Sequence, residues 1–157
     1  MTVRCLRTIL LVPGLLLAMG AAEPALGQSA GQQTIGGFLG LTDRNDADFT
    51  VGAEYEYHLD SMFSVGGILE YTPDAIGSSD ATVLMATGNF RPQTVPRLKL
   101  TGGVGAEFRR FDDNIRFRIG AGYDVIAAPV TITPRVAIDF GGGDENVILG
   151  ATFSQGF

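Results

Sequence analysis

The chain has 157 residues, a formal net charge of −6 and an isoelectric point of about 4.6. An acidic chain is a poor partner for nucleic acid, because the phosphates of nucleic acid are contacted mainly by Lys and Arg. The single cysteine is Cys5, so the chain beyond it offers no disulfide, no cysteine-based metal site and no thiol nucleophile. We therefore expect no cofactor and no metal centre.

Residues 1–27 have the layout of a secretory signal peptide. Two arginines precede an apolar run at 9–19, and small residues follow this run. The run is too short to span a bilayer as a helix. We expect cleavage after Gly27, with cleavage after Ala22 as the alternative, so that one mature domain spans 28–157.

The mature chain has the sequence pattern of an all-β protein. From residue 35 onward, apolar and polar residues alternate with a period of two, as in strands that are buried on one face. Clusters of Gly, Pro, Asp, Asn and Ser separate the alternating segments, and none of the segments has the period of an amphipathic helix. Eight antiparallel strands are predicted at 34–41, 49–59, 62–72, 81–90, 97–109, 115–126, 130–140 and 146–157.

The two faces of a strand are most distinct at 115–126, where Ile115 and Phe117 point to one side and Arg116 and Arg118 to the other. This alternation fits two architectures. A soluble barrel would turn its apolar face inward and could bind an apolar ligand there. A transmembrane barrel would turn its apolar face toward lipid and its polar face toward the lumen.

The positions of the aromatic residues favour the transmembrane barrel. If the first strand starts on the periplasmic side, most aromatics of the apolar faces fall at strand ends, as in the interfacial girdles of membrane barrels. Phe153, near mid-strand, is the exception. The predicted outer girdle contains Phe49, Tyr71, Phe108, Phe117 and Phe140, and the predicted inner girdle contains Tyr57, Phe63, Tyr123 and Phe157.

The opposite faces of the strands carry six acids and five bases, one of which is Arg109. The interior of an eight-stranded barrel is just wide enough for side chains to fill, and unpaired charges there would be costly, so a near balance is expected. The predicted ion network of the lumen comprises Glu54, Glu56, Glu70, Lys99, Glu107, Arg116, Arg118, Asp124, Arg135 and Asp139.

A specific register is predicted for the hairpin of the fifth and sixth strands. If Lys99 lies opposite Asp124, then Glu107 lies opposite Arg116. One register would therefore make two cross-strand ion pairs, each of which stabilises the sheet.

Neither a catalytic nor a metal site is predicted. His58, the single histidine, is expected on the polar face near Ser64, but a position inside the barrel would deny a Ser–His pair access to substrate. The acidic segment 43–48 begins like a calcium loop, yet Asp48 stands where an EF-hand requires glycine. The acidic outer loops could hold divalent cations that bridge to lipopolysaccharide, although a solvated loop surface is the simpler interpretation.

The last predicted strand ends in an aromatic residue, Phe157. We expect this strand to pair with the first one, which would close the barrel and remove both sheet edges. Its apolar face carries Leu149, Ala151 and Phe153, and Gln155 interrupts the pattern.

The signal peptide, the eight alternating strands and Phe157 together resemble the small eight-stranded outer-membrane barrel superfamily, which includes the barrel domain of outer-membrane protein A and the opacity-protein-like surface antigens. The resemblance implies a Gram-negative outer-membrane location. There we expect a monomer in contact with outer-membrane lipid and lipopolysaccharide. The resemblance also implies that the barrel-assembly machinery recognises the last strand, through Leu149, Ala151, Phe153 and Phe157.

From these observations we expect a structural or surface-exposed barrel without enzymatic activity, whose lumen is plugged by the ion network. A narrow channel for ions or small solutes is the first alternative. A soluble, secreted β-barrel that binds an apolar ligand is the second.

Overall fold

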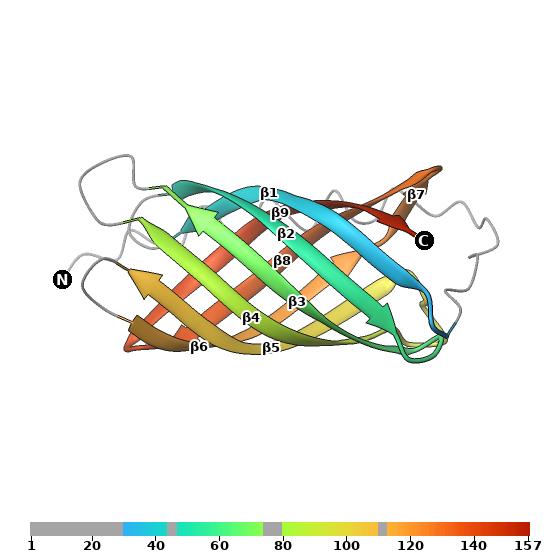
Figure 1. The fold of residues 1–157 in the computed structure, drawn as a ribbon, viewed down its shortest axis with the longest axis horizontal. Coiled ribbons are helices and arrows are strands. Elements are labelled where there is room, and N and C mark those ends of the chain that lie inside the picture. The colour runs from blue at the N-terminus through green and yellow to red at the C-terminus, as the bar shows by residue number, and fades with distance from the viewer. Residues whose placement is uncertain (1–29, 44–46, 74–79, 110–112) are drawn as a thin grey trace.

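The computed structural model describes residues 30–43, 47–73, 80–109 and 113–157. The signal segment 1–27 and parts of three connections lie outside the described residues. Within these ranges the chain forms a single sheet that closes on itself (Figure 1). Its strands are β1 (Gln33–Asp43), β2 (Ala47–His58), β3 (Phe63–Thr72), β4 (Ala81–Phe90), β5 (Leu98–Arg109), β6 (Asp113–Tyr123), β7 (Val125–Ala127), β8 (Val130–Gly141) and β9 (Asp144–Gly156).

The sheet is an eight-stranded, antiparallel, up-and-down barrel. Consecutive strands pair from β1 to β6, β8 pairs with β6 and β9, and β9 closes the ring against β1. The short β7 continues β6 beyond Asp124 and pairs with β8, so β6 and β7 together match one predicted strand. The predicted fold class is confirmed, and each predicted strand ends within two residues of the observed one. None of the described residues belongs to a helix that is long and apolar enough to cross a membrane.

The apolar face of the barrel lies outside and the polar face lies inside. Ile115 and Ile119 are each 65% exposed, whereas Arg116 and Arg118, on the same strand, are 0% and 2% exposed. A soluble protein would bury the isoleucines and solvate the arginines. The alternative of a soluble barrel with an apolar interior is therefore wrong, and the exterior suits the hydrocarbon of a bilayer.

The two ends of the barrel differ. We call one end the turn end, because the connections 59–62, 91–97 and 128–129 lie there, together with β7 and Phe157 (Figure 1). We call the opposite end, where β8 turns into β9 through Gly141–Gly143, the loop end. These three glycines have φ values of 135°, 65° and 91°, which L-amino acids with a side chain rarely adopt.

The register of the β5–β6 hairpin differs from the predicted one by two residues. Lys99 lies opposite Gly122, and Glu107 lies opposite Asn114. A shift of two residues leaves every side chain on the same face of the sheet. The alternation that identified the faces therefore carried no information on this register.

The lumen also holds apolar side chains, in two clusters. Ile68, Val83 and Met85 form one of them. Val83 and Met85 point inward from β4 while Leu84 points outward, so the middle of this strand is apolar on both faces and its sequence, ATVLMATGNF, alternates only weakly. The other cluster comprises Phe38, Ala137 and Ile148.

Candidate functional site

The charged lumen is the candidate functional site. In the described part of the barrel, six carboxylates and six Lys or Arg side chains form ion pairs there. The ten predicted network residues all belong to this set, and Arg109 and Arg91 complete it. The pairs fall into a central group, a loop-end group and a turn-end group.

Arg118 is the hub of the central group. Its Nη1 and Nη2 donate to the two oxygens of Glu70 at 2.9 and 2.6 Å, and its Nε and Nη2 donate to Asp139 at 2.6 and 2.7 Å. Arg135 pairs with Glu70 at 2.5 Å and also with Glu54. Arg118, Glu70 and Asp139 are almost fully buried, and such bidentate, charge-assisted bonds offset much of the cost of burying their charges.

Glu107 and Arg116 form the loop-end group with Arg109. Arg116 Nε donates to Glu107 at 2.5 Å, and Arg109 Nε donates to the other oxygen of that carboxylate at 2.6 Å. Arg116 Nη1 also donates to the backbone oxygens of Gly141 and Asp144, at 2.6 and 3.0 Å. The group therefore ties β5 and β6 to the tight β8–β9 turn. The predicted Glu107–Arg116 pair forms even though the two residues are not directly opposite.

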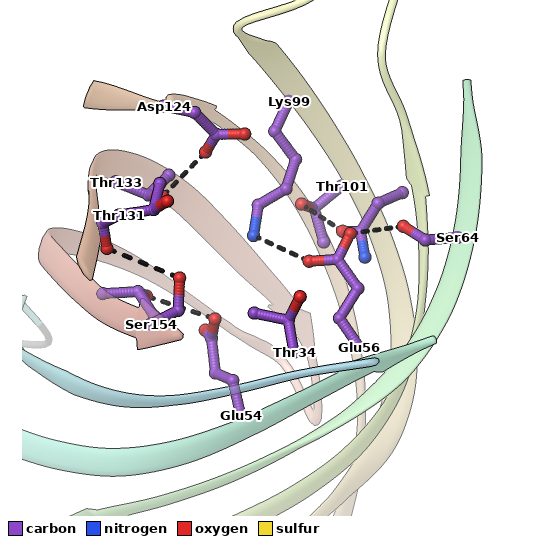
Figure 2. Close-up of polar contacts among 12 residues, drawn as sticks. Thr34, Glu54, Glu56, Ser64, Lys99, Thr101, Asp124, Thr131, Thr133 and Ser154 are labelled. Carbon is purple, nitrogen blue, oxygen red and sulfur yellow. Dashed lines mark hydrogen bonds and ion pairs between the residues drawn. The ribbon is translucent and has the colours of Figure 1, made fainter. Parts of the chain in front are cut away.

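The turn-end group is organised around Glu56. Arg91 Nη1 donates to Glu56 Oε1 at 2.6 Å, Lys99 Nζ lies 3.5 Å from Glu56 Oε2, and the Ser64 hydroxyl donates to the same carboxylate. Figure 2 shows Lys99 and Ser64 converging on Glu56 from different strands. The predicted pairing of Lys99 with Asp124 is wrong, because the observed register places Gly122 opposite Lys99.

Asp124 interrupts the strand between β6 and β7 and points into the lumen. Its Oδ2 accepts from Arg91 Nε at 3.2 Å. Its Oδ1 accepts from the Thr133 hydroxyl at 2.7 Å, as Figure 2 shows. Arg91 therefore bridges Glu56 and Asp124 across the barrel.

Sequence reasoning missed Arg91, because it lies in the 91–97 connection rather than on an alternating strand. Its backbone N–H donates to the Met62 oxygen at 2.7 Å, and its side chain turns into the lumen, where it is 5% exposed. Burial disfavours the charged guanidinium, but the hydrogen bond and charge of Glu56 and the charge of Asp124 outweigh it and raise the pKa of Arg91. The predicted imbalance of six acids against five bases was the one signal that pointed to a missing cation.

Phe38 is a second lumen residue that the sequence did not reveal. The guanidinium carbon of Arg135 lies 3.9 Å from the centre of its ring, a cation–π contact inside the barrel. Gly40 and Gly150 lie opposite each other on β1 and β9, and a Cβ on either would come within 2.4 or 2.6 Å of that ring. The Phe38 ring thus covers a glycine pair at the seam where the barrel closes.

The predicted girdle aromatics lie on the outer surface. Phe49, Tyr71, Phe108, Phe117 and Phe140 lie on the loop-end halves of their strands, and Tyr57, Phe63, Tyr123 and Phe157 lie toward the turn end. Phe117 and Phe140 pack at 5.8 Å between ring centres, and Phe63 packs at 5.1 Å against Phe90, a further outward aromatic.

The structure also shows where the predicted assembly residues of β9 and His58 lie. Leu149, Ala151, Phe153 and Phe157 face outward on β9 or follow it, and Phe153 and Phe157 are 43% and 70% exposed. His58 is 1% exposed, 3.3 Å from the Thr34 hydroxyl. Much of the acidic segment 43–48 lies outside the described residues, and the described ranges contain no cluster of metal-ligating side chains.

The free volume inside the barrel is large at the turn end and small farther in. At the turn end, a cavity of about 840 Å³ is open to solvent, and Arg91 and Asp124 lie in its lining. Farther in, the void next to Glu54, Lys99 and Arg135 measures only about 10 Å³.

Comparison with known proteins identifies the fold. No protein-family model matches the chain, and no curated protein sequence matches it. Several solved structures match it. The N-terminal β-barrel domain of Pseudomonas aeruginosa OprF is 15% identical, with a TM-score of 0.58 over 83% of this chain and 100% of that one.

Two further solved structures are named as outer-membrane proteins. Ail of Yersinia pestis is 12% identical, with a TM-score of 0.58 over 81% of this chain and 99% of its own. OprG of Pseudomonas aeruginosa is 14% identical, with a TM-score of 0.53 over 83% of this chain and 98% of its own. At these identities the likeness concerns the fold, which is that of the small eight-stranded outer-membrane β-barrels.

Proposed function

We propose that this chain is a monomeric, structural or surface-exposed barrel of a Gram-negative outer membrane, without enzymatic activity, and that its ion network plugs the lumen. The observation that carries the proposal is that, within the described part of the barrel, six buried or half-buried carboxylates pair with six bases inside the lumen. Such a network fixes side chains in place and fills the space that a permeating ion would need.

The size of the central void supports a closed lumen. A void of about 10 Å³ lies between the central and turn-end groups. A single water molecule needs a volume of about 10–15 Å³, so this void is too small for a hydrated ion, which supports a closed lumen. Near the loop end, the hydroxyls of Thr42, Thr50 and Thr72 form a further buried chain, with oxygen–oxygen distances of 2.7 and 2.8 Å.

Single-channel recording in planar bilayers tests the plug. We expect no stable open level for the mature chain, residues 28–157. A double substitution that removes the central crosslink without changing the net charge, E70A/R118A, should produce a measurable open level. The matched control is E145A/R97A, which removes one exposed acid and one half-exposed base outside the ion network and should leave the barrel closed.

A stable open level in the unmodified barrel would contradict the plug and would favour a narrow channel. The same result would leave the membrane location untouched. Cell fractionation tests that location separately, because the proposal requires the mature chain in the outer-membrane fraction, and its recovery in the soluble periplasm would contradict it.

We further propose that the barrel-assembly machinery recognises β9 through its outward residues and Phe157. The exposed position of Phe157 supports this, since a recognition residue must be accessible. Replacing Phe157 by Ala should lower the amount of folded barrel in cells, while leaving refolding of the purified chain into lipid vesicles almost unchanged. Val147→Ala, at the other end of β9, is the control and should leave the cellular amount unchanged.

A further inference from the structure

The cavity at the turn end has the dimensions of a ligand site. Its volume of about 840 Å³ falls within the range of about 300–1,000 Å³ that is typical of small-molecule pockets. The 91–97 connection, the β7–β8 hairpin and the ends of β1 and β9 surround it. At its inner side lie Arg91 and Asp124, which belong to the turn-end group of the lumen.

The charged residues that line this cavity favour an anion. The charged side chains of the lining are those of Arg91, Arg97 and Asp124. Both oxygens of Asp124 already accept hydrogen bonds, from Arg91 at 3.2 Å and from Thr133 at 2.7 Å. Asp124 and Arg91 are therefore both engaged, and the two arginines and one aspartate give the side chains of the lining a net charge of +1, although the whole chain carries a formal charge of −6.

Arg91 is held in place before any ligand arrives. Its backbone N–H is fixed by Met62, its Nε by Asp124 and its Nη1 by Glu56 and Ser64. The bonds of this side chain to described residues use Nε and Nη1, so Nη2 is the donor group that we assign to a further acceptor. A guanidinium that is already ordered loses little conformational entropy when it binds an oxyanion.

The neutral part of the lining completes the site. Gln32, Gln93 and Ser61 supply amide and hydroxyl groups that can donate hydrogen bonds, and Pro96 and Ile126 supply apolar surface. The loop end is more acidic, because among the described residues Asp43, Asp80, Asp113, Asp144 and Glu145 are all exposed there, whereas Asp60 is the exposed carboxylate side chain of the turn end. Since like charges repel, we expect an anion to favour the turn end over the loop end.

We propose that the turn-end cavity binds small solutes that carry a carboxylate or phosphate group, and that they enter from the turn end. Arg91 and Arg97 bind the oxyanion, and the polar and apolar lining contacts the rest of the solute. This site does not require the lumen to be closed, so its test is independent of the conductance test.

Titration of the refolded barrel in lipid nanodiscs tests the site. Sodium citrate and sodium pyrophosphate serve as the carboxylate and phosphate probes, in buffers of equal, low ionic strength, with binding followed by calorimetry and by backbone amide NMR shifts. We expect saturable binding of at least one probe, with shifts concentrated in 91–97 and 124–131. The probe that binds more tightly identifies the preferred oxyanion.

The variant Arg97→Gln should weaken this binding about tenfold or more, because it removes one charge-assisted hydrogen-bond donor. Arg97 is half-exposed, so the variant should fold, which heat-modifiable gel migration verifies. Arg109→Gln near the loop end makes the same change in net charge and should bind like the unmodified barrel. Equal binding by the barrel and by R97Q would overturn the proposal, as would equal weakening in both variants or shifts centred on the loop end.

Discussion

Arg118 on β6 and Glu70 on β3 face each other across the lumen and form a two-pronged ion pair, with nitrogen–oxygen distances of 2.9 and 2.6 Å. β3 and β6 are not neighbours in the sheet, so this pair links opposite walls of the barrel. Asp139 on β8 holds the same guanidinium from a third direction. The pair is thus a crosslink that the hydrogen bonds of the sheet do not provide.

Replacing Arg118 by Ala should lower the free energy of unfolding by about 3–5 kcal/mol, because Glu70 and Asp139 would keep buried charges with a partner removed. Reversible urea unfolding in lipid vesicles measures this. Arg118→Lys should recover only a part of the loss, since an ammonium cannot make the paired bonds of a guanidinium. Arg109→Ala is the control at a more exposed ion pair, and a similar loss there would contradict the crosslink.

The contribution of Arg91 should not change with pH across the range in which the barrel is studied. Its pKa is raised in the folded chain, so its contribution is fully present below the usual guanidinium pKa and is lost only as pH rises through the raised value. Arg91→Ala should therefore lower the free energy of unfolding by about 1.5–3 kcal/mol, equally at pH of about 7 and 9. A loss that shrinks between these two values would contradict the assignment of Arg91 as a fixed cation.

Two glycines of β5 should respond oppositely to the same substitution. A Cβ at Gly105 would lie 2.1 Å from the Leu84 backbone oxygen, whereas a Cβ at Gly102 would meet nothing within 4 Å. Gly105→Ala should therefore destabilise the barrel by about 1–3 kcal/mol through overpacking. Gly102→Ala should be neutral or stabilising by up to about 1 kcal/mol, because alanine has less freedom than glycine in the unfolded chain.

Guanidinium unfolding of the two β5 variants under identical lipid conditions gives the comparison. Equal effects would mean that neighbouring backbone does not approach Gly105 more closely than Gly102.

Removing the Phe38 ring should weaken the seam between β1 and β9. Phe38→Ala would leave a cavity over Gly40 and Gly150 and remove the contact with Arg135, with an expected loss of about 3–5 kcal/mol in the free energy of unfolding. Phe153→Ala, on the lipid side of the same seam, should cost less, because lipid can fill the space. If the two substitutions cost the same, the ring does not support the seam from inside.

The faces of the strands followed from the sequence because they depend on a period of two, which is a local property. Ile115 and Arg116 are adjacent in the chain, so the alternation alone separates them, and the aromatics at the strand ends favour lipid on the apolar side. The same local pattern identified the ten predicted charges of the lumen. Their position on the lumen side needed no knowledge of which strand faces which.

Pairing inside the lumen depends on distances that no local pattern encodes. A shift of two residues keeps Lys99 on its face but changes its neighbour, so the predicted pair with Asp124 was wrong and Glu56 takes its place. Arg91 lies in a connection, so no alternation of neighbouring residues indicates which way its side chain points.

By itself, therefore, the sequence determined the strands, their two faces and the near balance of lumen charge. Closure of the barrel decided the rest: the sixth cation, the ring of Phe38 over its glycine pair, and the contact between Arg118 and Glu70. The physical reason is that closure brings together side chains from strands that are distant in sequence, and their packing and charge then select the partners.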